Sequence, residues 1–356
     1  MLVLSRIANI KVGILAVIAL FMVSCHQDYD IQRSTENIIL TADGSTKLIG
    51  ETITFSVTSN NGDDLTQDSQ IFVDGEAIDG NTYTNNQIGS HTITAKYFTV
   101  TSDPVTVNFH DGSEINFVKR LLIEDYTGTW CGYCPRVARA IELVHNLTDA
   151  YVPVAIHRAS SSPENATYDP YNFDTTVLEN QINVPGYPKG MLNRTTQWSY
   201  PEPNNVNQAI GFTQGDNPKM GLAMQASISG GQISLTVKAK CAKDFTGTKL
   251  VVYVLENGLI HDQYNYTTYY GAQNPIPNYE HNHVLRGCLT SLLGDAVSDS
   301  EVEVGETYSR SFNVPLPANV ANAANVEFVA FMLDANNAAI NVRKAAPGDN
   351  QDFEEL

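Results

Sequence analysis

The chain has few basic residues. Its 356 residues include 21 Lys and Arg against 39 Asp and Glu, and the formal net charge is −18 at pH 7. Such a chain lacks the basic patch that nucleic-acid binding requires. It also lacks the positive charge that holds proteins on anionic lipid. We therefore predict no nucleic-acid partner and attribute the acidic balance to solubility.

Cysteine is also scarce, at five residues, and only Cys131 and Cys134 have Cys-x-x-Cys spacing. A zinc site needs two further ligands, usually from a second Cys pair or a His pair. No second Cys-x-x-Cys occurs in the sequence. His281 and His283 could supply two ligands, but no partner set accompanies them. We therefore predict neither a metal nor a cofactor.

The apolar run near the start of the chain is too short to span a membrane. It covers residues 12–23. Twelve helical residues extend about 18 Å, against a hydrocarbon core of about 30 Å. Arg6 and Lys11 supply the positive charge that precedes such a run. Residues 1–24 are therefore predicted to be an export signal rather than a transmembrane helix.

The signal ends at Ser24-Cys25, a small residue followed by cysteine. This ending resembles the lipobox of bacterial lipoproteins, with Met22 where Leu is more common. The resemblance implies cleavage before Cys25 and attachment of diacylglycerol to its sulfur. The mature protein would then be a lipid-anchored protein of the cell envelope, with residues 25–36 as a polar tether.

The stretch with the most functional information is residues 121–135, LLIEDYTGTWCGYCP. It begins as a buried strand, and after Pro135 apolar residues recur at helical spacing. The two cysteines thus precede a helix N-terminus, whose free N–H groups and partial positive charge favour a thiolate. Cys131 is predicted to be the exposed nucleophile and Cys134 the resolving thiol. A structural disulfide is the alternative.

The sequence from Trp130 to Cys134 resembles the active-site region of thioredoxin-like proteins. The longer stretch IEDYTGTWCGYCP resembles, more narrowly, the Omp28-related outer-membrane lipoproteins of the Bacteroidetes. The resemblance implies a thioredoxin-like α/β domain over residues 111–216, with Trp130 in its catalytic site. It also implies a buried proton-relaying acid six residues before the first cysteine, which is Asp125. Glu124 is the alternative, because sequence alone cannot fix which carboxylate points inward.

The same resemblance implies a cis-proline at the start of a strand that faces the cysteines. There a substrate peptide can pair with the protein as an added strand. Pro188 matches this position, about fifty residues after Cys134 and just before an apolar strand. Pro185 is the second choice, and an ordinary turn proline is a further alternative.

Short alternating strands bounded by turns flank this region on both sides. Residues 37–110 resemble the immunoglobulin-like sandwich modules of exported proteins. The alternating pattern of residues 217–346 predicts a second β-sandwich, and residues 347–356 are predicted to be an acidic tail. The predicted fold class is therefore multidomain, with a central thioredoxin-like α/β domain between two immunoglobulin-like β-sandwich domains.

Cys241 and Cys288 lie in the second predicted sandwich. Export into an oxidising compartment favours their pairing as a structural disulfide, and such a bridge would add about 4 kcal/mol by the chain-entropy argument. Residues 261–287, between them, are rich in tyrosine. We expect a long loop that packs on the dithiol domain, or a surface that binds peptides or glycans.

Two functional hypotheses follow. The first is a lipid-anchored thiol–disulfide oxidoreductase or isomerase whose partners are the thiols and disulfides of exported proteins. Cys131 would attack, Cys134 would resolve, and Asp125 would transfer protons while Pro188 positions the substrate. The alternative is an outer-membrane or surface binding or adhesion lipoprotein that uses the thioredoxin-like domain as a scaffold. An intact Cys-x-x-Cys favours the enzyme, because a scaffold needs neither thiol.

Overall fold

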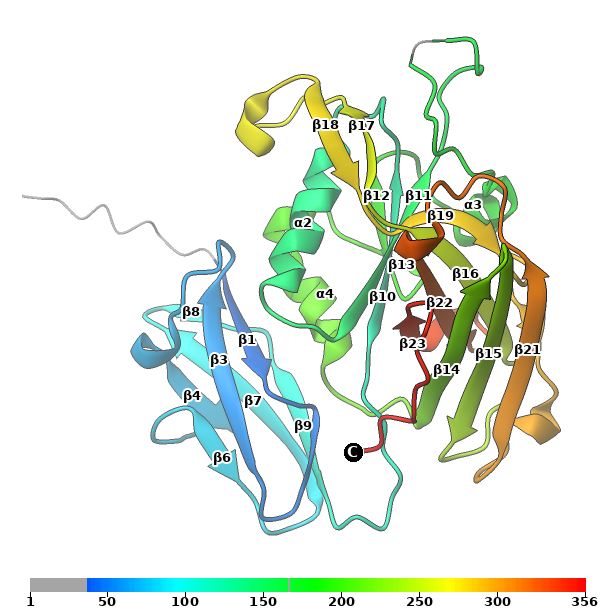
Figure 1. The fold of residues 1–356 in the computed structure, drawn as a ribbon. Helices are drawn as coiled ribbons and strands as arrows, with labels where there is room; N and C mark the ends of the chain where they lie inside the picture. The colour runs from blue at the N-terminus through cyan, green and yellow to red at the C-terminus, as the bar shows by residue number, and fades with distance from the viewer. Residues whose placement is uncertain (1–36, 166) are drawn as a thin grey trace, which may run out of the picture. The chain divides into compact units, whose positions relative to one another are not determined.

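A computed structural model describes residues 37–165 and 167–356. The predicted signal and the whole of the predicted tether, which begins at Cys25, lie outside the described residues. Strands dominate the part that is described, and they form five sheets (Figure 1). No helix within this part is long and apolar enough to cross a membrane.

Residues 38–110 form two sheets around a shared core. One sheet has the order β1 (Ile38–Ala42), β3 (Thr52–Ser59) and β6 (Thr82–Thr84). The other has the order β2 (Thr46–Leu48), β9 (Val105–His110), β7 (Gly89–Tyr97), β4 (Gln70–Val73) and β5 (Glu76–Ala77), with β8 (Val100–Thr101) beside β7. Successive side chains of a strand point to opposite faces, so the alternate residues Ile53, Phe55 and Val57 enter the core together.

A nine-stranded sheet occupies the middle of the remaining chain. Its order is β13 (Thr196–Gln197), β12 (Lys189–Leu192), β10 (Leu121–Thr127), β11 (Tyr151–His157), β19 (Val284–Cys288), β16 (Lys249–Glu256), β22 (Val326–Leu333) and β23 (Ala339–Ala345), with β20 (Asp295–Ala296) beside β16. Strand β10 pairs in parallel with β11 and antiparallel with β12. The strands around the Cys-x-x-Cys thus share one sheet with strands from the C-terminal part of the chain.

The prediction of a central thioredoxin-like α/β domain is wrong. The chain is mostly strand, and the described helices are few: α2 (Pro135–His145), α3 (Thr176–Ile182) and α4 (Val206–Thr213), with short 3-10 turns elsewhere. The strands of residues 111–216 also have no sheet of their own. Ala155 of β11 pairs with Val284 of β19, and its N–H donates to the His283 carbonyl at 2.8 Å. That junction continues the sheet into the C-terminal strands.

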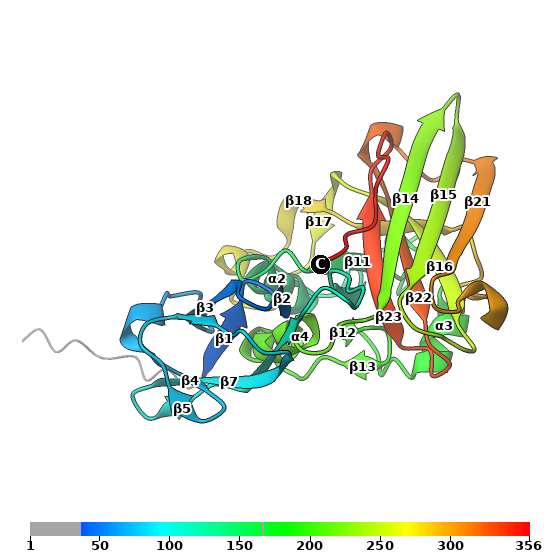
Figure 2. The ribbon, with the colours of Figure 1, turned by 90° about the horizontal axis from the view of Figure 1, so that it is seen from below.

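A three-stranded sheet packs on one face of these C-terminal strands (Figure 2). It consists of β14 (Met220–Ser229), β15 (Gln232–Cys241) and β21 (Thr307–Pro315). Alternation along β16 sends Val252 and Val254 into the core between the two sheets. Tyr253 and Leu255 point the opposite way, into a second core that includes Leu122 of β10. The predicted acidic tail is hydrogen-bonded to the fold, since Gln351 N–H donates to the Met224 carbonyl at 2.9 Å.

Cys241 and Cys288 do not form the predicted disulfide, and both are free thiols. Cys241 belongs to the core between the two sheets, where burial raises the pKa of its thiol to about 11. Cys288 packs against the second core, on the other face of the nine-stranded sheet. The sheet therefore separates the two sulfurs, which sequence spacing could not show.

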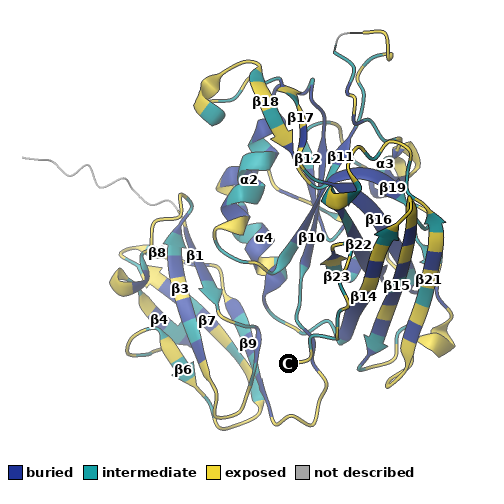
Figure 3. Ribbon diagram, in the orientation of Figure 1, coloured by how far each residue is buried: buried dark blue, intermediate teal, exposed yellow. Residues whose placement is uncertain are grey.

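Strand β10 is buried along its whole length (Figure 3). Its alternate residues pack into two different hydrophobic cores. Leu122 and Tyr126 face the second core. Leu121 and Ile123 face a third core, which contains residues of α2 and α4. The adjacent carboxylates Glu124 and Asp125 therefore lie on opposite faces of one buried strand.

Candidate functional site

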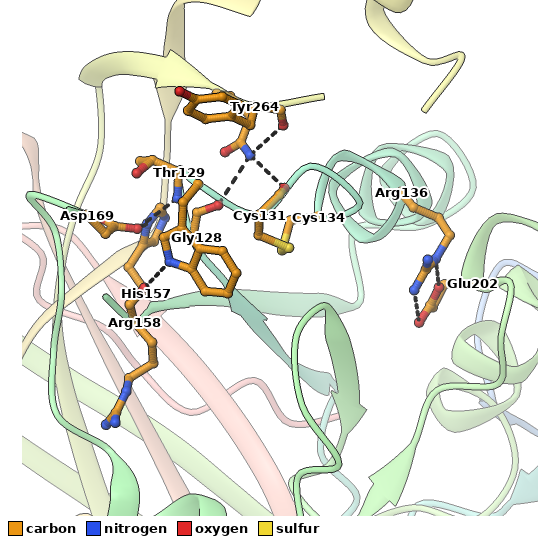
Figure 4. The surroundings of a disulfide bond; sticks show 12 residues. Gly128, Thr129, Cys131, Cys134, Arg136, His157, Arg158, Asp169, Glu202 and Tyr264 are labelled. Atoms are coloured by element: carbon orange, nitrogen blue, oxygen red, sulfur yellow. Dashed lines mark hydrogen bonds and ion pairs between the residues drawn. A yellow bond between two sulfur atoms is a disulfide. The ribbon is translucent and has the colours of Figure 1, made fainter. Parts of the chain in front are cut away.

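The Cys-x-x-Cys lies between a strand and a helix, as the sequence predicts. Strand β10 ends at Thr127 and helix α2 begins at Pro135, with Cys134 as its N-cap residue. Cys131 and Cys134 are joined by a disulfide, with their Cα atoms 5.4 Å apart (Figure 4). The spacing of apolar residues after Pro135 thus located the helix correctly.

The disulfide is not open to solvent, so the prediction that Cys131 is an exposed nucleophile is wrong. Cys131 is 4% exposed and Cys134 is 1% exposed. The cause is a segment from the C-terminal part of the chain, residues 259–281, which we call the tyrosine segment. It contains the two-stranded sheet of β17 (Leu259–Gln263) and β18 (Ile276–His281).

The tyrosine segment is hydrogen-bonded to the loop that carries the cysteines. Tyr264 N–H donates to the Thr129 carbonyl at 2.8 Å, and Tyr266 N–H donates to the Gly132 carbonyl at 2.6 Å. The Gln263 amide donates to the Cys131 carbonyl at 3.1 Å (Figure 4). These bonds close the segment over the disulfide.

Gly132 is required by this close approach. A Cβ atom built on Gly132 would lie 2.3 Å from a ring carbon of Tyr266, a separation that real Cβ atoms do not show. The sequence contained a partial signal for this cover, namely the concentration of tyrosines in residues 261–287. It did not show where those tyrosines pack.

Trp130 and Pro188 both lie near the end of β10. The Trp130 indole N–H donates to the Arg158 carbonyl at 2.6 Å, and its ring lies 6.2 Å from the ring of Tyr187. The Tyr187–Pro188 peptide bond is cis. Strand β12 begins directly after Pro188, where Lys189 pairs with Tyr126 of β10.

Asp125 and Cys134 line the same cleft, whereas Glu124 lies on the opposite face of β10. Asp125 is buried, and its Oδ1 has no hydrogen-bond partner. Burial, and then repulsion from the Glu202 carboxylate, raise the pKa of Asp125 well above its usual value, while Arg136 lowers it less. Of the two candidates, Asp125 is thus the carboxyl on the cysteine side.

A buried network that sequence reasoning missed supports the other side of the cysteine loop. Asp169 Oδ2 accepts the Thr129 N–H and pairs with His157 Nδ1, each at 2.8 Å (Figure 4). Burial raises the pKa of Asp169, but the hydrogen bond and charge of His157 outweigh it and lower that pKa overall. His157 is therefore a buried histidine that is hydrogen-bonded to Asp169. Asp169 lay in a polar stretch that carried no motif.

His281 and His283 do not act as a pair. The His281 ring lies 5.1 Å from the ring of His157, while His283 Nδ1 lies 3.1 Å from a Glu327 carboxylate oxygen. Burial, followed by the charge of His157, lowers the pKa of His281 to about 3. Within the described part of the chain, no group of three or more His, Cys, Asp or Glu is arranged to hold a metal.

A cleft of about 420 Å³ lies on the cysteine side of β10. Helix α2, strand β11 and strand β18 each contribute to its walls. The tyrosine segment is hydrogen-bonded to helix α2, because the Tyr270 hydroxyl donates to Glu142 at 2.7 Å. The site thus combines a covered disulfide with a neighbouring cleft.

The family of outer membrane protein Omp28 matches this chain over residues 175–351. The match supports an outer membrane location for the chain. It includes the tyrosine segment but not Cys131 or Cys134. A search of curated proteins finds no match.

The solved structures that are similar to this one include two bacterial proteins. HBP35 of Porphyromonas gingivalis has a TM-score of 0.50 at 18% sequence identity, over 66% of this chain and 79% of that chain. A structural-genomics protein from Agrobacterium tumefaciens has a TM-score of 0.41 at 11% identity, over 65% of this chain and 96% of that chain. The likeness to HBP35 shows a common fold and nothing further about activity.

Proposed function

We propose that this chain is an outer membrane lipoprotein that binds a protein partner through its tyrosine segment. The observation that carries the proposal is the covered disulfide. Because Tyr266 and its neighbours close over Cys131, the oxidised pair supports a rigid surface instead of facing solvent.

Two exposed tyrosine rings lie on this surface. Tyr133, between the cysteines, is 56% exposed, and Tyr266 is 59% exposed. Their ring centroids are 5.6 Å apart in an edge-to-face arrangement. Ile260 of β17 is also exposed. Rigid tyrosines supply large contact area at little entropic loss, and they are enriched among residues that dominate protein interfaces.

The backbone under both rings is restrained. The disulfide spans the turn that carries Tyr133, and the Tyr266 N–H donates to the Gly132 carbonyl. A surface that is ordered before binding loses less conformational freedom when the partner arrives. This favours recognition by a preformed aromatic patch.

Site-specific photo-crosslinking would test the binding surface. A photoreactive residue at position 266 should crosslink one defined envelope protein in intact cells, and Tyr133→Ser should reduce its yield by about tenfold, as for a central interface tyrosine. Phe98→Ser is the matched control, because Phe98 is an exposed aromatic residue elsewhere in the chain. Equal yields from Tyr133→Ser and the parent would contradict the proposal.

Anchoring through Cys25 is the second part of the proposal. Lipid on this sulfur would hold the chain at the membrane. Cys25→Ser should move the chain from the membrane fraction to the soluble fraction, and mass spectrometry of the parent should find an acylated N-terminal peptide. An unmodified Cys25 in membrane-bound protein would contradict the lipid anchor.

Thiol–disulfide exchange is a second candidate, favoured by Asp125, which lines the same cleft as Cys134. A partner thiolate would attack Cys131 Sγ and break the disulfide, and Cys134 would leave and take a proton from the Asp125 carboxyl. The partner's second thiol would then displace Cys131, so that the partner gains a disulfide and this chain becomes a dithiol. Exchange requires the tyrosine segment to move away from Cys131.

Trapping distinguishes the two candidates. Cys134→Ser leaves Cys131 without its resolving thiol, so an exchange enzyme should accumulate mixed disulfides that dithiothreitol releases. A binding protein should give no such species while its crosslink from position 266 remains. The double variant Cys131→Ser and Cys134→Ser is the control for non-specific trapping.

A further inference from the structure

The cleft beside the disulfide has the dimensions of a small-molecule site. Its volume is about 420 Å³, and ligand sites measure roughly 300–1,000 Å³. Figure 1 shows the strands of the tyrosine segment beside helix α2, which forms one wall. We propose that this cleft binds a small arylalkyl amine, that is, an aromatic ring on a short chain that ends in an ammonium group. This site is separate from the exposed tyrosines that we assign to the protein partner.

Two buried polar atoms in the cleft lack partners. Asp125 and His281 both line it, and each is only 5% exposed. Neither Asp125 Oδ1 nor His281 Nε2 has a hydrogen-bond partner. Leaving a buried polar group unpaired costs about 1–3 kcal/mol. A ligand that donates hydrogen bonds here would remove that penalty.

The two atoms are suited to accept hydrogen bonds. Burial lowers the pKa of His281 to about 3, so its ring is neutral at pH 7, and Nε2 is a nitrogen without a hydrogen-bond partner. In a neutral imidazole whose other nitrogen donates, the free nitrogen is an acceptor. An ammonium group has three N–H donors and no acceptor. It therefore complements His281 Nε2, and its positive charge favours the ionised form of the Asp125 carboxyl, which burial otherwise keeps neutral.

The charges around the cleft favour a cation. Of the described residues that line it, none is Lys or Arg, whereas Glu142 and Glu280 are among them. The Glu142 carboxylate also forms an ion pair with Arg139, with an N–O distance of 2.9 Å. It therefore attracts a bound cation less strongly than an unpaired carboxylate would. The ring of Tyr279 also lines the cleft. An aromatic face attracts an ammonium ion through its quadrupole, while an anion would be repelled.

The apolar residues of the cleft lining would contact the aromatic ring of the ligand. Pro135, Ala138 and Ile141 present apolar surface from α2, and Pro153 and Ala155 do so from β11. Burying an apolar ring against such surface contributes about 25 cal/mol per Å². A ligand with a flat ring and a short amine arm therefore matches both parts of the cleft.

Calorimetric titration of the full chain with 2-phenylethylamine tests the proposal. Two analogues of similar size serve as controls: neutral 2-phenylethanol and anionic 3-phenylpropionate. The amine should bind at least about tenfold more tightly than the alcohol, as expected for a charge-assisted contact, and the anion should show no binding. Failure of the amine to bind, or equal affinity for the alcohol, would overturn the proposal.

Variants assign the binding to this cleft. Asp125→Asn should weaken amine binding by about tenfold, while Asp79→Asn, at an exposed carboxylate outside the cleft, should not change it. Ala138→Phe fills the cleft from α2 without altering charge, and it decides the matter if Asp125→Asn does not fold. Wild-type affinity in both cleft variants would place the amine elsewhere and overturn the assignment.

Discussion

The two faces of strand β10 bury neighbouring carboxylates in opposite ways. On one face, Glu124 is fully buried and accepts the Tyr253 hydroxyl at 3.0 Å. The Arg194 guanidinium lies 3.4 Å from the same carboxylate oxygen and also donates to Tyr253. Arg194 further lies over the Phe331 ring, 5.0 Å from its centroid. This charge is neutralised inside the protein.

On the other face, Asp125 lines the cleft, and its Oδ1 has no hydrogen-bond partner. Burial raises its pKa, so the carboxyl favours its neutral form. The first face holds a charge pair between Glu124 of β10 and Arg194, which follows β12, and the Tyr253 hydroxyl of β16 is hydrogen-bonded to both. Unpaired polar atoms occur on both faces, because Glu124 Oε2 also lacks a hydrogen-bond partner, but Asp125 is the carboxyl that lines the cleft. Burial alone therefore does not separate a structural carboxylate from a functional one, whereas its partners do.

The largest expected effect comes from breaking the pair on the structural face. Glu124→Leu leaves the Arg194 charge buried without a carboxylate, and removal of one partner of a buried pair typically costs about 3–5 kcal/mol. Urea unfolding measures this loss. The double variant Glu124→Leu and Arg194→Met should recover most of the stability. A single variant as stable as the parent would show that the pair is not ionic.

The next largest effect is a loss of stability at acidic pH, caused by His281, which lines the cleft. The folded-state pKa of His281 is about 3, below its unfolded value of 6.5. The folded state therefore binds fewer protons, and this stability falls as the pH drops below about 6.5, by up to about 1.4 kcal/mol per pH unit. His281→Phe should flatten the unfolding free energy between pH 6.5 and 4.5. An unfolding free energy that falls with pH as steeply in His281→Phe as in the parent would contradict this assignment.

A smaller effect of opposite sign is expected at Asp125. Its folded-state pKa is raised, so the folded state binds more protons and stability is lost as the pH rises above the unfolded value of about 4. Asp125→Asn should stabilise the chain by roughly 1–2 kcal/mol at pH 7 and by less at pH 4. Thermal unfolding at the two pH values measures it. A gain that is larger at pH 4 would contradict this sign.

The smallest effect concerns the separated thiols. Because Cys241 and Cys288 lie on opposite faces of the nine-stranded sheet, Cys241→Ala should leave Cys288 reduced and should not create a new disulfide. In the parent chain, peptide mapping without reductant should find Cys241 and Cys288 each as an unlinked, alkylated thiol after unfolding. A linked peptide that contains both cysteines would restore the pairing that the sequence suggested.

Local sequence signals predicted some of this arrangement. The apolar spacing after Pro135 located α2, and the strand before Thr127 placed the cysteines at its end. Alternation also put Glu124 and Asp125 on different faces. It could not say which face carried the cleft, because both faces of β10 are buried.

The parts that sequence could not predict depend on contacts between distant residues. The pairing of Ala155 with Val284 extends the sheet across the predicted domain boundary, and neither residue carries a pairing signal. The cover over Cys131 likewise depends on where Tyr266 packs, which the tyrosine content of its segment does not reveal. The predicted fold class was wrong because of the pairing between Ala155 and Val284. The prediction that Cys131 is exposed was wrong because the tyrosine segment covers it.

The reduction rate of the Cys131–Cys134 disulfide tests the central claim most directly. With dithiothreitol and mass-spectrometric counting of thiols, the folded chain should be reduced at least about tenfold more slowly than the urea-unfolded chain, since exchange requires access to the sulfur. Tyr266→Ala should remove much of that protection, and Phe98→Ser should not. A folded disulfide that reduces as fast as the unfolded one, unaffected by Tyr266→Ala, would contradict the account.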